Sequence, residues 1–193
     1  MPDASRFPPG PSSAVLTLPN LITVARLCAV PAAIYLVLHA MYPAAFWLFL
    51  GAGASDAVDG WLARRRGPTY IGAVLDPLAD KALLMAMYVV LAVVYVLPDW
   101  LAILVVFRDV LIVGGVLVLN VLGAPPEIRP LMVSKVNTVL QIVLVGVALL
   151  LAGFGRHADL TLQVLIWLVA ASTTISGGAY VARAARRPKG GRL

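Results

Sequence analysis

Four aspartates lie within one short stretch of apolar sequence. Asp56, Asp59, Asp76 and Asp80 make up four of the nine acidic residues in this chain. Ionisable groups at membrane depth are costly and usually mark a functional site. Oxygen ligands without Cys or His favour a hard cation such as Mg²⁺ or Mn²⁺ over zinc or copper. The stretch therefore predicts a divalent metal site.

Helical spacing predicts how these residues are placed. At about 100° per residue, five residues of the helix expected at 43–64 fall on one face, within an arc of about 140°. That face carries Asp56, Asp59, Gly60, Ala63 and Arg64. The next helix carries Gly72, Asp76 and Asp80 within an arc of about 80°. Because the two helices are consecutive and antiparallel, both carboxylate pairs should lie at a similar depth.

The small residues on the first of these faces allow two interpretations. Gly60 and Ala63 alone would indicate close helix packing, which is common in membranes. Beside two carboxylates they instead leave room for a ligand to approach the backbone. A purely structural set of Asp–Arg and Asp–Lys pairs is disfavoured, since too few cations lie nearby in the sequence.

The elements that position this site are predicted to be membrane helices. The chain is 61% hydrophobic and 12% charged, with a mean hydropathy of +0.94. Crossing about 30 Å of hydrocarbon takes about 20 helical residues. Six stretches meet this need, near 20–40, 43–64, 72–97, 99–122, 131–152 and 160–183. We predict an all-α integral membrane protein with a bundle of six transmembrane helices in residues 17–185, a flexible leader in 1–16 and a basic tail in 186–193.

Charge placement predicts the orientation of the bundle. Most Arg and Lys residues fall on the N-terminal segment, the second and fourth loops and the tail, including the Arg64–Arg66 cluster. The positive-inside rule puts both termini and this cluster on the cytoplasmic side. Nucleic-acid binding is disfavoured, because no soluble basic surface with stacking aromatic residues is visible.

The aspartate stretch resembles a family signature, Asp-x2-Asp-Gly-x2-Ala-Arg followed after a spacer by Gly-x3-Asp-x3-Asp. Every fixed position of this CDP-alcohol phosphotransferase signature is present, with the spacer running from Arg65 to Ile71. Pro19-Asn20-x2-Thr23-x2-Arg26 resembles the family's N-terminal pattern. The amphipathic helix that often precedes the first span has no clear counterpart in the Pro- and Gly-rich leader.

The resemblance implies an enzyme that displaces CMP from CDP-diacylglycerol with an alcohol, at a two-metal centre. By similarity, Asp56, Asp59, Asp76 and Asp80 would bind the metals, and Asp80 would be the general base. The nucleotide diphosphate would be held by Asn20, Thr23, Asp59, Gly60, Ala63, Arg64 and Gly72. The resemblance also implies a homodimer among membrane lipids, with the site facing the cytoplasm of a bacterial inner membrane.

The acceptor alcohol is predicted from other helices. Arg108 and Asp109 form either a structural ion pair or a partial site for an acceptor phosphate. Lys135 either extends to the membrane interface or binds the acceptor. The stretch Ser134-Lys135-x-Asn137-Thr138 resembles that of CMP-forming cardiolipin synthases, whereas phosphatidylglycerophosphate synthases carry a second lysine where Asn137 stands. The prediction is phosphatidylglycerol as acceptor, yielding cardiolipin, with glycerol 3-phosphate as the alternative.

Two other classes use intramembrane carboxylates. An intramembrane prenyltransferase would need two separated Asp motifs and more helices than six. A cation transporter would carry acidic groups at several depths and in both halves of the chain. Here one cluster lies near one side of the membrane, so both classes are disfavoured.

Overall fold

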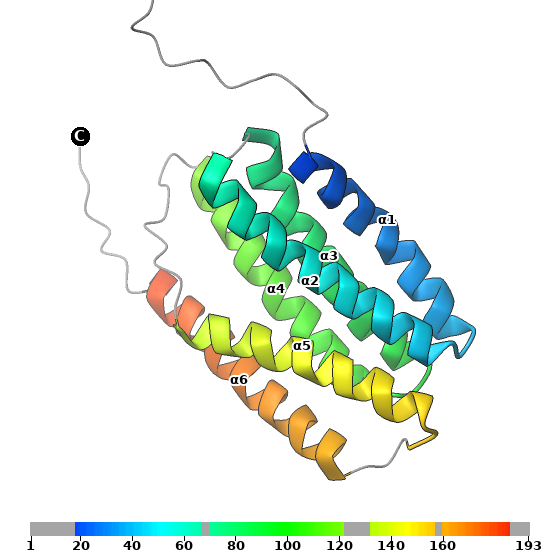
Figure 1. The fold of residues 1–193 in the computed structure, drawn as a ribbon. Coiled ribbons are helices and arrows are strands. Elements are labelled where there is room, and N and C mark those ends of the chain that lie inside the picture. Colours follow the sequence, from blue (N-terminus) through cyan, green and yellow to red (C-terminus); the bar gives the residue numbers. More distant parts are fainter. Residues whose placement is uncertain (1–17, 67–69, 122–131, 157–159, 186–193) are drawn as a thin grey trace, which may run out of the picture.

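Long helices make up the fold (Figure 1). The computed structural model describes the backbone of residues 18–66, 70–121, 132–156 and 160–185, and the side chains of 24–55, 81–115, 132–156 and 160–182. Within these ranges there are six helices and no strand. They are α1 (Leu18–Leu38), α2 (Tyr42–Arg66), α3 (Tyr70–Val93), α4 (Asp99–Val121), α5 (Met132–Gly153) and α6 (Leu160–Ala185). The prediction of an all-helical chain is confirmed.

The third helix is shorter than its apolar stretch. The prediction of a helix to residue 97 is wrong, because α3 ends at Val93. Tyr95 has a φ of 58°, which is left-handed backbone. The Tyr95 N–H donates to the Ala92 carbonyl at 2.9 Å, and the Val96 N–H donates to the Leu91 carbonyl at 2.9 Å. This pair of hydrogen bonds is the Schellman motif, which terminates a helix while satisfying its last carbonyl groups.

The same motif ends two other helices. Ala40 after α1 has a φ of 55°, and Gly155 after α5 has a φ of 69°. The Met41 N–H donates to the Leu36 carbonyl at 2.8 Å, and the same type of hydrogen bond follows Gly155. Each of these three helices therefore ends in a tight turn, and Figure 1 shows that the three helix ends lie at one end of the bundle.

Replacing Tyr95 with Gly should stabilise the protein. A left-handed conformation costs a non-glycine residue roughly 1–2 kcal/mol, and the Tyr95 side chain is 87% exposed, so few contacts are lost. We expect a rise of a few degrees in Tm, measured by thermal unfolding in detergent. Tyr95→Ala, which removes the side chain but keeps the strain, should show no such rise; an equal rise in both variants would contradict the explanation.

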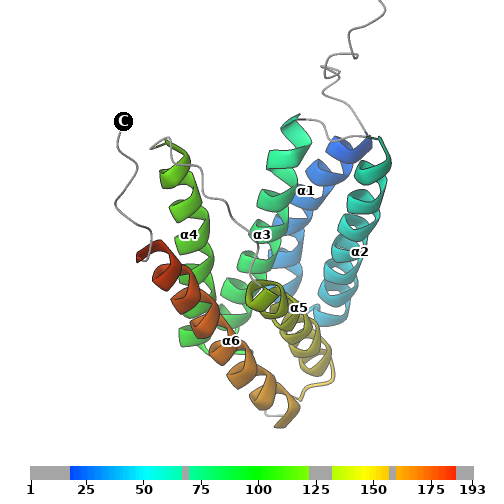
Figure 2. The ribbon, with the colours of Figure 1, turned by 90° about the vertical axis from the view of Figure 1, so that its left-hand side faces the viewer.

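Four of the helices form a ring. Both α1 and α5 contact α2 and α3, so α2 and α3 lie diagonally across the ring from each other. Figure 2 shows α1 behind α2 and α3 and α5 in front of them. The remaining helices, α4 and α6, pack against each other, with α4 also against α3 and α6 also against α5. Helices α4 and α3 diverge toward the end of the bundle that carries the C-terminus of α4 (Figure 2).

A tightly packed interior contrasts with an apolar surface. Met87, Leu91, Leu101, Leu144 and Leu149 are completely buried. On the outer faces, large apolar side chains are more than 60% exposed, including Trp47, Ile103, Phe107 and Trp167. Exposed apolar area of this extent marks contact with a membrane or another protein. Among the described residues, α5 and the segment Leu160–Ala182 of α6 are long and apolar enough to cross a membrane.

Candidate active site

The aspartates of α2 continue a buried stripe of that helix. Ala45, Phe49 and Ala52 are buried and lie four and three residues apart, so they share the interior face of α2. Continuing the same alternation of four and three residues leads to Asp56 and Asp59. The helix runs unbroken through both positions. The backbone register therefore places the first aspartate pair on the face of α2 that points into the ring.

The aspartates of α3 likewise continue a buried stripe of their helix. Leu84, Met87 and Leu91 are at most 5% exposed and occupy one face of the helix. Counting back from Leu84 by two steps of four residues leads to Asp80 and Asp76. Both positions are helical. The second aspartate pair thus continues the interior face of α3.

The two interior faces are opposed across the ring. Because α1 and α5 each contact both α2 and α3, the interior faces of α2 and α3 point toward a common axis. The aspartates lie in the halves of the two helices next to the α2–α3 connection, which is the end away from the three tight turns (Figure 1). This arrangement brings four carboxylate-bearing positions to one end of a four-helix ring. Their side chains, and those of Asn20, Thr23, Gly60, Ala63, Arg64 and Gly72, lie outside the described residues.

A buried cation on α1 joins this end of the ring. Arg26 is only 2% exposed and lies seven residues before Ala33, which is fully buried on the interior face of α1. It borders a groove of about 430 Å³ between α1 and α2, which Ser55 also lines. Ser55 directly precedes Asp56 in α2. Arg26 was not among the residues predicted for the site, although a charge inside the first apolar stretch is a signal that could have identified it.

A charged network ties α3 to the other half of the bundle. Lys81 Nζ donates to Asp109 Oδ2 at 2.8 Å, and Arg108 Nη1 donates to Asp109 Oδ1 at 2.5 Å. Arg108 Nη2 also lies 2.6 Å from Ser134 Oγ of α5 and 2.6 Å from Ser176 Oγ of α6. Four helices therefore meet through these five side chains.

This network differs from a surface ion pair because two of its charged side chains are buried. The side chains of Arg108 and Asp109 are 4% and 1% exposed, whereas that of Lys81 is 29% exposed. A buried ion pair requires further hydrogen bonds to offset the loss of water, and the two serines supply them to Arg108. The structure thus shows the ion pair that the sequence suggested as one alternative for Arg108 and Asp109.

A second polar cluster lies on the buried face of α5. Asn137 Oδ1 accepts hydrogen bonds from Ser172 and Thr173 of α6, each at 2.8 Å. Gln141, one turn further, is also fully buried, and its backbone carbonyl accepts from the Tyr88 hydroxyl at 3.2 Å. These residues follow Ser134 at intervals of three and four. That spacing was visible in the sequence, but the partners on α6 were not.

The two residues predicted to bind the acceptor differ in burial. Arg108 is buried inside the network, whereas Lys135 is exposed on the first turn of α5. Ser134, next to Lys135, is the one that reaches Arg108.

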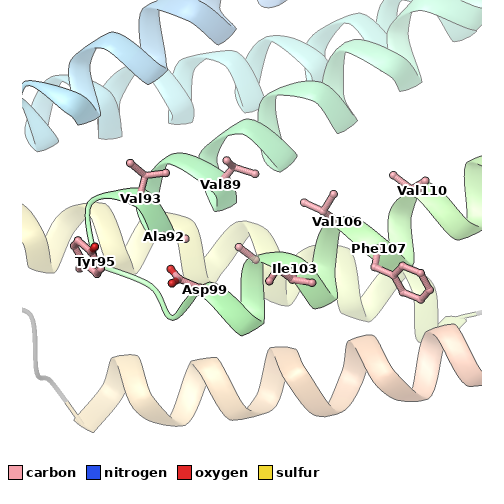
Figure 3. Close-up of a pocket in the computed structure, with 10 residues that line it drawn as sticks. Val89, Ala92, Val93, Tyr95, Asp99, Ile103, Val106, Phe107 and Val110 are labelled. Carbon is pink, nitrogen blue, oxygen red and sulfur yellow. The ribbon is translucent and has the colours of Figure 1, made fainter.

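A separate groove follows the outer side of α3 and α4. It has a volume of about 750 Å³ and is lined mainly by aliphatic side chains, with Tyr95 and Asp99 at the turn (Figure 3). Val89 is the lining residue of α3 that lies nearest to Asp80 in sequence, nine positions away. At 1.5 Å per residue this is about 13 Å along the helix. The groove suits hydrocarbon, and it lacks the polar groups that phosphate chemistry needs.

The donor set at the aspartate end fits a hard divalent cation. The register supplies four carboxylates and no thiol or imidazole, which matches the ligand preference of Mg²⁺ and Mn²⁺. In the part of the chain whose side chains are described, no other group of three or more His, Cys, Asp or Glu residues is arranged to hold a metal.

Comparisons with known proteins point to one family. The family model described as CDP-alcohol phosphatidyltransferase matches residues 16–175. A fission yeast protein named cardiolipin synthase (CMP-forming) / mitochondrial hydrolase fusion protein is 36% identical over 86% of this chain. A rice protein named CDP-diacylglycerol–glycerol-3-phosphate 3-phosphatidyltransferase 1, chloroplastic, is also 36% identical over 86% of the chain.

The coverage of these relatives differs. The chain spans 31% of the Schizosaccharomyces pombe protein and 56% of the Oryza sativa protein. A Bacillus subtilis protein named CDP-diacylglycerol–glycerol-3-phosphate 3-phosphatidyltransferase is 31% identical over 88% of this chain, and the match covers 95% of that relative.

Proposed function

The chain belongs to the CDP-alcohol phosphatidyltransferase family, and we propose that it transfers a phosphatidyl group from CDP-diacylglycerol to a glycerol-bearing acceptor. CMP is the second product. The observation that carries this proposal is the opposition of two aspartate stripes, on α2 and α3, at one end of the helix ring. Such an arrangement concentrates negative charge where a metal-assisted phosphoryl transfer needs it.

The reaction requires one bond to form and one to break. The acceptor hydroxyl oxygen bonds to the phosphorus that carries diacylglycerol, and the bond from this phosphorus to the oxygen bridging to CMP breaks. CMP leaves with the bridging oxygen, and the hydroxyl proton passes to Asp80. A carboxylate in this position is a weak base but stays ionised, so it is always ready to accept the proton.

The other aspartates act through the metal site. Asp56, Asp59 and Asp76, with Asp80, would hold a two-metal centre of Mg²⁺ or Mn²⁺. Bound metal ions would neutralise charge on the transferred and leaving oxygens. Gly60 and Ala63 leave space beside α2 for the cytidine diphosphate. The remaining contacts to it come from Asn20, Thr23, Arg64 and Gly72.

Phosphatidylglycerol is the proposed acceptor, which makes cardiolipin the product. Asn137 is fully buried and accepts two hydrogen bonds, so this position supplies no cation to a soluble, doubly charged phosphate. Glycerol 3-phosphate is the second candidate, because the Bacillus subtilis relative that the chain covers almost completely is named for that acceptor. One relative named cardiolipin synthase and one named for glycerol 3-phosphate are each 36% identical to this chain. The choice of acceptor therefore depends on Asn137 and its surroundings.

An acceptor panel tests this choice. Purified protein would receive CDP-diacylglycerol, a divalent metal and either phosphatidylglycerol, glycerol 3-phosphate, inositol phosphate or serine, with lipid products resolved by mass spectrometry. We expect cardiolipin with phosphatidylglycerol and little product with inositol phosphate or serine. Product from glycerol 3-phosphate alone would overturn the acceptor assignment while leaving the reaction class intact.

Lys135 is proposed to contact the acceptor phosphate, with Arg108 adding positive charge from within the bundle. Replacing Lys135 with Gln should raise the KM for the acceptor about tenfold, since a hydrogen bond to a charged group contributes roughly 1.5–3 kcal/mol. The KM for CDP-diacylglycerol and the Tm should change little, because Lys135 is exposed. Lys135→Arg, which keeps the charge, is the control. Equal acceptor KM values for the wild type and Lys135→Gln would rule out this contact.

The membrane placement is part of the same proposal. All six helices are proposed to cross the bilayer, supported by their lengths and by the exposed apolar side chains on their outer faces. Both termini and the aspartate end would face the cytoplasm. This orientation is supported by the excess of Arg and Lys in the N-terminal segment, the second and fourth loops and the tail. A homodimer in a bacterial inner membrane, surrounded by lipid, completes the proposal.

A further inference from the structure

We propose that Asp109 and Lys81 form a positioning pair that fixes the rotation of α3, and thereby the placement of Asp80. This inference rests on the proposed function, because it concerns the residue proposed as the general base. Neither residue is a fixed position of the signature discussed above. Their pairing became visible only in the structure, where Lys81 Nζ lies 2.8 Å from Asp109 Oδ2.

Asp109, which receives Lys81, is held by a chain of hydrogen bonds. One oxygen of Asp109 accepts from Lys81 and the other accepts from Arg108. Arg108 is in turn held by Ser134 of α5 and Ser176 of α6. The carboxylate that receives Lys81 is thus fixed by three helices, and with 1% side-chain exposure it is shielded from water.

Lys81 transmits this position to the proposed active site. It directly follows Asp80 in an unbroken part of α3, and successive helical residues are rotated by about 100°. Lys81 points to α4. The positions of Asp76 and Asp80 therefore lie on a different face of α3, in line with Leu84 and Met87. The ion pair therefore sets the rotation of the helix at the level where the chemistry is proposed.

Small rotations have large consequences at such a site. With side chains reaching about 5–6 Å from the helix axis, a rotation of about 20° displaces a side-chain group by about 2 Å. A misplacement of about 1 Å can reduce a rate by about 10²-fold. Since α4 and α3 diverge toward the aspartate end (Figure 2), a polar link at this depth is well placed to limit such a rotation.

The test compares two polar links of the same helix face. Lys81→Met removes the ammonium but leaves Asp109 paired with Arg108, so no buried charge loses its partner. Tyr88→Phe is the matched control. It lies seven residues further along the same face of α3 and removes the hydrogen bond to the Gln141 carbonyl. We expect Lys81→Met to lower kcat about 10–100-fold, with Tm no lower than in Tyr88→Phe, while Tyr88→Phe keeps wild-type kcat.

Binding of Mn²⁺, measured by electron paramagnetic resonance, provides a readout independent of turnover. Removing a positive charge beside the site would by itself tighten Mn²⁺ binding. Loss of positioning would instead weaken it about tenfold, as is typical when groups that orient metal ligands are removed. We therefore expect weaker Mn²⁺ binding in Lys81→Met and recovery of both affinity and kcat in Lys81→Arg. Tighter or unchanged binding with unchanged kcat would overturn the proposal.

The design separates this inference from the proposed function. If the wild type neither binds Mn²⁺ nor releases CMP, the proposed function fails. If the wild type does both and Lys81→Met matches it, only the positioning pair fails. Should Lys81→Met not fold, Lys81→Gln provides the same comparison with a polar, uncharged side chain of similar length.

Discussion

Replacing Asp56 or Asp59 with Asn should reduce kcat by on the order of 10³-fold or more. The register of α2 places both residues on the interior face that continues Ala45, Phe49 and Ala52. An amide is a neutral and weaker metal ligand than a carboxylate, so each substitution removes charge that the proposed divalent centre needs. Metal ions contribute several kcal/mol to the stabilisation of a phosphoryl-transfer transition state, and about 1.4 kcal/mol corresponds to tenfold in rate.

The measurement for this prediction is CMP release together with Mn²⁺ binding by electron paramagnetic resonance. Both should fall in each variant. Asp99→Asn is the control, because Asp99 is an exposed carboxylate at the opposite end of the bundle, on the first turn of α4. Wild-type turnover in Asp56→Asn or Asp59→Asn would remove α2 from the proposed metal centre.

Replacing Asp80 with Asn should lower kcat by roughly 10²–10⁴-fold, which is the usual contribution of a general base. The KM for CDP-diacylglycerol should change much less, because the residues proposed to hold the donor lie mainly on α1 and α2. Since Asp80 is also a proposed metal ligand, Mn²⁺ binding should weaken, but less than in the α2 variants. Steady-state kinetics with both substrates varied separates these effects.

Asp80→Glu keeps the carboxylate and is the companion variant. It should retain more activity than Asp80→Asn if proton transfer is what matters at this position. Full activity in Asp80→Asn would show that another group takes the proton of the acceptor hydroxyl.

The helices themselves could be predicted from the sequence, because long apolar runs of about 20 residues leave few alternatives to a helix. Five of the six predicted stretches agree with the structure to within two residues at each end. The third did not, since apolar residues continue past Val93 through Leu97 while the backbone turns at Tyr95. Hydropathy reports solvent preference and carries little information on the left-handed residue that ends a helix.

The candidate site was predictable only within each helix. Periodicity gave the aspartate faces of α2 and α3, because spacing along one helix determines which residues share a face. It did not give the diagonal placement of α2 and α3, which depends on how α1 and α5 pack between them. Nor did it give the serine partners of Arg108, since Ser134 and Ser176 come from two other helices.

The most direct test of the proposed function is CMP release by purified protein in lipid nanodiscs containing CDP-diacylglycerol. Reactions would contain Mg²⁺ or Mn²⁺ with phosphatidylglycerol, the metal alone, or phosphatidylglycerol with a chelator. We predict CMP and cardiolipin in equal amounts when both metal and acceptor are present, and neither product when one is omitted. CMP release that persists in the chelator, or cardiolipin formed without CMP, would contradict a metal-dependent transfer at the two aspartate stripes.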